Sequence, residues 1–204
     1  MAYSDFTLKT VKAKFGLQLV ENKSLFSEIA SCVVSEYLLQ TLKRNIPLAL
    51  AINTEKARSE LIIINVLLEI KTQLLDKISL FSGIDFTVDK ENGLAGFCDY
   101  IVSQSSEQFY LDTPLIMVVE AKNENINNGL GQCIAEMYAA QLFNSRENKQ
   151  LPAIYGAVTT GDEWKFLRLH GEVVLIDKDS YYINEIAKIV GILTHLIQST
   201  KPDI

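Results

Sequence analysis

Three short runs rich in β-branched and aromatic residues stand in the middle of the chain, and they constrain its fold more than any other feature. They occupy residues 84–88, 95–103 and 114–122, and Asn-Gly, Ser-rich and Asp-Thr-Pro segments separate them. Runs of this kind, bounded by turn residues, are typical of strands. The sequence therefore predicts three sequential strands arranged as a meander.

Helical spacing of apolar residues surrounds this meander. A first helix is predicted at 24–43, ending before Pro47, and a second from the N-cap Thr54 to about Phe81, buried on several sides. The remaining elements are a helix at 127–144, strands at 153–160, 164–170 and 172–177, and a helix at 183–198. This order predicts an α/β fold with a central mixed β-sheet flanked by helices.

Length and composition favour one globular domain over residues 1–204. Hydrophobic residues make up 48% and charged residues 22%, which is close to the average for globular proteins. A chain of 204 residues is long enough for one well-buried core. No internal repeat or Pro/Gly/Ser-rich linker marks a boundary between domains.

Cysteine usage and the chain start predict a cytoplasmic protein that does not enter membranes. The three cysteines are far apart and form no CxxC pair, and residues 1–5 lack the pattern of a secretory signal. The longest apolar stretch, 61–68, is far below the roughly 20 residues that a membrane span requires. The net charge of −6 argues against a protein that coats nucleic acid, although it permits a local basic groove.

The end of the third predicted strand carries two opposite charges on one face. Side chains alternate along a strand, so Glu120 and Lys122 point the same way. If the strand at 95–103 pairs antiparallel with this one, Asp99 lies beside Glu120. Two carboxylates and one ammonium would then converge.

Two neighbouring carboxylates raise each other's pKa unless a cation lies between them, and oxygen ligands suit Mg²⁺ or Mn²⁺. Such an ion activates water and neutralises charge on a phosphodiester. Lys122 would orient the nucleophile or stabilise the pentacovalent oxyanion. The pattern therefore predicts hydrolysis of phosphodiester bonds.

These residues resemble the signature of the PD-(D/E)XK nuclease superfamily, in which an Asp ends one strand and a Glu-x-Lys ends the next. Asp99 matches the Asp, and Glu120-Ala121-Lys122 matches the Glu-x-Lys, while Cys98 replaces the usual preceding Pro. The resemblance covers residues 54–160. It implies a restriction-endonuclease-like core and Mg²⁺- or Mn²⁺-dependent cleavage of nucleic acid, most naturally DNA. Because nucleases of this fold often pair to cut both strands, it also implies a possible homodimer.

Many members of this superfamily also carry a Glu on the helix before the meander and a Gln on the helix after it. Glu60 and Gln132 match these places. Glu69 lies nine residues after Glu60, which puts it on the opposite side of a helix, so we predict that Glu60 faces the site. The resemblance thus implies Asp99, Glu120 and Glu60 as metal ligands and Lys122 and Gln132 as further catalytic residues. Helical spacing places Glu136 on the same face as Gln132.

Other interpretations stay open. A Glu-x-Lys by itself is more often a surface ion pair than an active site. The chain could also be a non-catalytic binding or regulatory module with the nuclease fold, or an accessory protein of a mobile element or restriction system. The alternating aromatic and basic residues at 164–168 could contact nucleic acid, but a half-buried strand is favoured. Two histidines without metal-ligand spacing argue against zinc, and no GxSxG or GxxxxGK motif occurs.

Overall fold

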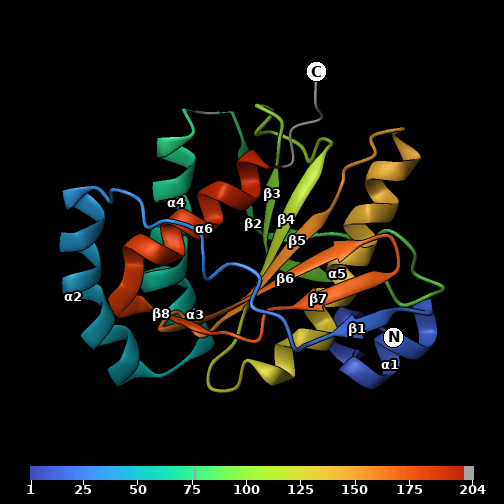
Figure 1. Ribbon diagram of the computed structural model, residues 1–204, viewed down its shortest axis with the longest axis horizontal. Coiled ribbons are helices and arrows are strands. Elements are labelled where there is room, and N and C mark those ends of the chain that lie inside the picture. The colour runs from blue at the N-terminus through green and yellow to red at the C-terminus, as the bar shows by residue number, and fades with distance from the viewer. Residues whose placement is uncertain (76, 200–204) are drawn as a thin grey trace.

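A computed structural model describes residues 1–75 and 77–199 of the chain. It is an α/β structure whose centre is an open, mixed sheet of eight strands (Figure 1). The strand order is β1-β7-β6-β5-β4-β3-β2, with β8 paired to β6. The β1–β7 and β4–β5 pairs are parallel, and the other pairs are antiparallel. The strands are β1 Gln18–Val20, β2 Ser79–Asp85, β3 Phe97–Ser103, β4 Leu115–Ala121, β5 Ile154–Thr159, β6 Glu163–His170, β7 Val173–Ile176 and β8 Tyr181–Tyr182.

Helices cover both faces of the sheet. In Figure 1, α2, α4 and α6 lie on one side and α1 and α5 on the other, and a separate hydrophobic cluster fills each interface. The helical elements are η1 Tyr3–Asp5, α1 Leu8–Phe15, α2 Glu36–Ile52, α3 Glu55–Arg58, η2 Ser59–Ile63, α4 Ile64–Gln73, α5 Asn127–Arg146, η3 Ile183–Glu185 and α6 Ile186–Gln198. No helix within 1–75 or 77–199 is long and apolar enough to cross a membrane.

The meander is confirmed, with one boundary shifted. Strands β2, β3 and β4 are consecutive antiparallel neighbours, and all seven residues of β4 are buried. Strand β2 lies earlier than the predicted run at 84–88, because Ser79 pairs with Ser103 and extends the ladder toward the N-terminus. The later strands β5, β6 and β7 and the helices α5 and α6 agree closely with the predicted elements.

The predicted helix at 24–43 is wrong in its first half. Residues 24–35 form an irregular segment, and α2 begins only at Glu36 and continues through Pro47 to Ile52. Leu25 and Ile29 have helical spacing for another reason. Both are partly buried against the core, although neither is part of a helix. This segment packs closely on α6, where a Cβ at Gly191 would lie 2.4 Å from the carbonyl oxygen of Ala30.

The predicted helix at 54–81 is shorter and less regular than expected. Thr54 is its N-cap, as predicted, and accepts a hydrogen bond from the amide of Ala57 at 3.1 Å. The π-helical segment η2 interrupts it, and α4 ends at Gln73. Residues 79–81 belong to β2, and residue 76 of the predicted helix lies outside the described residues. Pairing with β3 therefore overrides helical spacing at this end.

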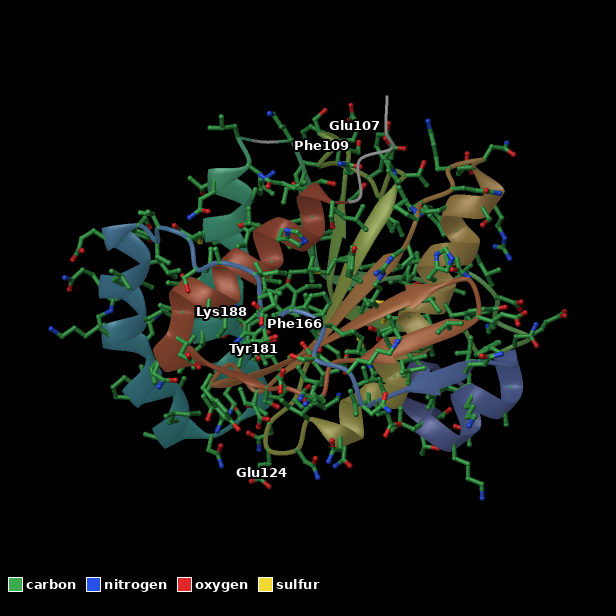
Figure 2. The ribbon with its side chains drawn as sticks, in the orientation of Figure 1. Glu107, Phe109, Glu124, Phe166, Tyr181 and Lys188 are labelled. Carbon is green, nitrogen blue, oxygen red and sulfur yellow. The ribbon has the colours of Figure 1, made fainter. Side chains whose placement is uncertain are left out.

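Two elements near the N-terminus were not predicted. Helix α1 packs on α5, and β1 adds a parallel strand to β7. The alternation at 164–168, by contrast, belongs to an interior strand, as favoured. Trp164 and Phe166 are fully buried, and Figure 2 shows Phe166 beside Tyr181 in the interior of the molecule.

Candidate active site

Asp99 and Glu120 lie at adjacent strand ends. Tyr100 of β3 pairs with Val119 of β4, so the antiparallel register carries Asp99 and Glu120 to neighbouring positions. The side chain of Asp99 ties the two strands together, since its Oδ2 accepts a hydrogen bond from the amide of Ala121 at 2.7 Å. The two predicted acidic residues therefore occupy neighbouring positions where β4 ends.

The ammonium of Lys122 connects this strand end with α5 and α3, and its backbone amide connects it with β5. Its Nζ lies 2.5 Å from Glu120 Oε1 and 3.4 Å from Oε1 of Gln132 on α5. On the opposite side it lies 4.0 Å from Oε2 of Glu55, at the start of α3. The backbone of Lys122 is also fixed, because its amide donates to the carbonyl of Thr159 on β5 at 2.8 Å.

A cleft of about 400 Å³ opens beside these residues. It runs between the helical segment that begins with α3 and the ends of β2, β3 and β4. Acidic groups, hydroxyl groups and backbone line it, and its residues are Glu55, Lys56, Ser59, Glu60, Ile64, Ser82, Gly83, Asp99, Tyr100 and Ala121. Glu120 is 1% exposed and lies beneath the surface rather than in this cleft wall.

The structure places Glu60 on the cleft and Glu69 away from it. The Glu60 side chain is 66% exposed and forms an ion pair with Lys56 at 3.8 Å. The carboxylate of Glu69 is buried and accepts hydrogen bonds from the amide and hydroxyl of Ser35, at 2.8 and 2.6 Å. Glu69 thus holds the N-cap residue of α2 in place. Burial alone would raise the pKa of Glu69, but the hydrogen bonds that its carboxylate accepts lower it overall.

Glu55 is a cleft residue that the sequence analysis did not select. Its carboxylate forms an ion pair with Lys122, whereas that of Glu60 forms one with the exposed Lys56. The available signal was its place in the first turn after the N-cap Thr54. Burial raises the pKa of Glu55, Lys122 lowers it, and Asp99 raises it further.

Two side chains fix the helical segment that forms one wall of the cleft. Arg58 donates from Nη1 to the carbonyl of Thr160 at 2.8 Å and to Asp162 Oδ1 at 2.5 Å, which joins α3 to the turn after β5. The hydroxyl of Tyr100 donates to the carbonyl of Ser59 at 3.1 Å. Because π-helical insertions often occur at functional sites, the position of η2 beside this cleft fits a functional role.

A second buried carboxyl group, Glu136 of α5, lies behind Glu120. Burial raises the pKa of both side chains, and the Glu136 charge raises that of Glu120 further, followed by the charge of Asp99. Oε2 of Glu120 and Oε2 of Glu136 are buried without a hydrogen-bond partner among the described residues. Glu136 was placed on the face of Gln132 from the sequence, but its burial was not foreseen.

Lys122 keeps its positive charge in this environment. Burial alone would lower its pKa, but the charge and hydrogen bond of Glu120 raise it, and Glu55 and Asp99 add to this effect, so the pKa is raised in total. A permanently charged ammonium next to two carboxylates is suited to stabilise developing negative charge.

The carboxylates at this strand end were compared with the ligand requirements of a divalent cation. Within 1–75 and 77–199, no three His, Cys, Asp or Glu side chains are grouped so that they alone would hold a metal ion. Mg²⁺, however, is usually bound by one or two carboxylates plus waters and substrate phosphates. Asp99 and Glu120 are such a pair, and Glu120 Oε2 is a buried acceptor without a donor among the described residues.

No protein-family model matches the chain, and no curated protein matches it at a significant level.

Proposed function

We propose that this protein is a metal-dependent nuclease that hydrolyses phosphodiester bonds in DNA, built on a restriction-endonuclease-like core. The observation that carries the proposal is the placement of Asp99, Glu120 and Lys122 at the adjacent ends of β3 and β4, beside an open cleft. The order of helix, three-strand meander, helix and parallel strand around these residues also supports it. Neither feature identifies the substrate. The choice of DNA as the substrate rests on the resemblance to the PD-(D/E)XK superfamily.

In this proposal Asp99 and Glu120 hold Mg²⁺ or Mn²⁺. When bound, the ion supplies an activated water and neutralises charge on the scissile phosphate. The side chains of Glu55 and Glu60 line the same cleft and limit the space that is open to the substrate. Because Lys56 also lines the cleft, the cleft offers a cationic donor for phosphate oxygens among its acidic groups.

Lys122 has the position required to act on charge at the cleft. Its ammonium lies between the buried carboxylate of Glu120 and the cleft-lining carboxylate of Glu55. From there it stabilises the negative charge of a pentacovalent phosphorus or orients the attacking water. Its raised pKa keeps it protonated, so it acts as a fixed positive charge rather than as a general base.

Nicking of a supercoiled plasmid in Mg²⁺ and in Mn²⁺ tests the proposal directly. The natural chain should nick DNA, and Asp99→Ala and Glu120→Ala should not, because each loses an oxygen ligand. Glu172→Ala is the matched control, since it removes an exposed carboxylate outside the cleft. Full activity of Asp99→Ala, or equal loss in the control, would contradict the assignment.

A non-catalytic binding or regulatory module is the second candidate, and one observation favours it. The Glu120 carboxylate is almost fully buried and already bonded to Lys122, so the ion pair is satisfied without a metal. Thermal unfolding with and without Mn²⁺ separates the candidates, because binding at a hundred times Kd stabilises the fold by about 2.7 kcal/mol. Stabilisation that Asp99→Ala abolishes supports the nuclease, and its absence in the natural chain supports the module.

A further inference from the structure

The side chains behind Glu120 form a continuous chain of polar contacts between β4 and α5. Lys122 Nζ donates to Oε1 of Gln132, and Gln132 Nε2 donates to Oε1 of Glu136 at 3.0 Å. Lys122 also donates to Glu120, whose pKa responds to the charge of Glu136. The contacts therefore run in one line from Glu120 through Lys122 and Gln132 to Glu136.

Glu136 cannot reach a substrate. It is 0% exposed, and the cleft walls do not include it. Its neighbours along α5 are the buried apolar residues Cys133, Ile134, Ala135 and Met137. An apolar side chain would cost the fold less at this position, because a buried carboxyl must lose its hydration. The position of Glu136 therefore points to a role in arranging other groups.

The group that Glu136 arranges is the side-chain amide of Gln132. An amide has one accepting and one donating end, and its partners decide which way it turns. The ammonium of Lys122 only donates, so it requires the oxygen of Gln132, and the Glu136 carboxyl accepts from the nitrogen. With both partners present, one orientation of the amide satisfies all contacts. Without Glu136, the nitrogen of Gln132 loses its acceptor and nothing on α5 holds the amide in this orientation.

Close packing of α5 on Lys122 makes this control effective. A Cβ added at Gly129 would lie 3.0 Å from Cγ and 3.1 Å from Cε of Lys122, so the helix already touches the lysine stem. The stem is thus confined by α5, and the head group is oriented by Glu120, Glu55 and Gln132. A change in the Gln132 amide is transmitted directly to the ammonium.

We propose that Glu136 is a positioning residue that orients the Gln132 amide and thereby holds the Lys122 ammonium in its working position. The proposal rests on the nuclease function proposed above, in which Lys122 stabilises charge on the phosphate. It assigns to Glu136 no contact with substrate or metal.

A double-mutant cycle tests this role. Glu136→Met should lower kcat for DNA cleavage by about 10- to 100-fold, as is usual when a supporting partner is lost, and should leave KM nearly unchanged. Glu136→Gln keeps an acceptor for the Gln132 nitrogen and should retain most of the activity. In a Gln132→Met background, Glu136→Met should have little further effect, because both act on one interaction. Met137→Leu, at a fully buried neighbouring position, is the packing control and should behave like the natural chain.

A labelling experiment decides the point independently of cleavage. Acetic anhydride acylates free amines, and mass spectrometry gives the relative rate at each lysine. Lys122 should be labelled several-fold faster in Glu136→Met than in the natural chain, whereas the exposed Lys56 should be labelled equally in both. Met137→Leu should leave the Lys122 rate unchanged.

The outcomes separate the two proposals. Unchanged Lys122 labelling in Glu136→Met, additive losses in the cycle, or an equal loss in Glu136→Gln would overturn the role of Glu136. If the natural chain cleaves no nucleic acid with either metal, the nuclease function is wrong. In that case faster labelling of Lys122 would still support the positioning contact, and unchanged labelling would overturn it.

Discussion

Glu136→Gln should stabilise the metal-free protein at pH 8, because it removes a buried carboxyl group whose pKa is raised. Burial raises the pKa of Glu136 to about 8, from an ordinary value of about 4.3. Between these values the folded chain keeps a proton on Glu136 that the unfolded chain releases. The unfolded state then binds fewer protons, so the stability of the natural chain falls as pH rises through this window.

The size of the effect follows from the shift. Each pH unit costs 1.36 kcal/mol for one proton, and the window from about 4.3 to about 8 corresponds to roughly 5 kcal/mol. Gln does not titrate and keeps nearly the same volume, so the variant lacks this loss. Near pH 4 both chains should have similar free energies of unfolding. The difference should grow up to about pH 8 and then level off.

Urea unfolding in EDTA between pH 4 and 9 measures this difference. Glu120 titrates in both proteins, so the natural chain is compared with the variant at each pH rather than with itself. Glu172→Gln serves as the control, because it neutralises an exposed carboxylate and should follow the natural chain. Parallel curves for the natural chain and Glu136→Gln across the whole range would refute the reasoning.

Three further predictions concern the cleft. Lys122→Ala should still bind Mn²⁺ in a calorimetric titration, since the carboxylates remain. Plasmid nicking by this variant should fall by about 10²- to 10³-fold. Loss of metal binding would show that Lys122 has a role other than stabilising charge on the phosphate. Glu55→Gln should reduce nicking more than Glu60→Gln, because Glu55 forms an ion pair with Lys122 whereas Glu60 forms one with Lys56. The reverse order in the same assay would favour Glu60 as the site residue. Gly129→Ala should destabilise the protein by about 1–3 kcal/mol in urea, because its Cβ would lie 2.7 Å from Val158 Cγ1; an unchanged unfolding midpoint would show that α5 shifts freely.

Local rules were sufficient for the meander and for the pairing of its charged ends. A strand has a period of two and antiparallel neighbours share a register, so Asp99, Glu120 and Lys122 could be placed together from spacing alone. The N-cap at Thr54 was likewise readable, because a side-chain oxygen satisfies a nearby amide whatever surrounds the helix.

Local rules failed where apolar spacing had a tertiary cause. Leu25 and Ile29 are spaced as in a helix, yet they are core contacts of an irregular segment that packs on α6. Residues 79–81 continue a helical pattern but join β2, because the edge of β3 offers hydrogen bonds to them. In both places the partner is distant in sequence, so no local pattern reveals it.

The site residues likewise fall into those that the sequence places and those that only the tertiary structure places. The sequence by itself determined which strand ends carry Asp99, Glu120 and Lys122, because that follows from the geometry of one chain segment and its neighbour. Only the tertiary structure decided that Glu55 reaches Lys122 and that Glu136 is fully buried behind Glu120. Those facts depend on how α3 and α5 are rotated and how closely they approach the sheet, and packing of side chains from the whole molecule sets both.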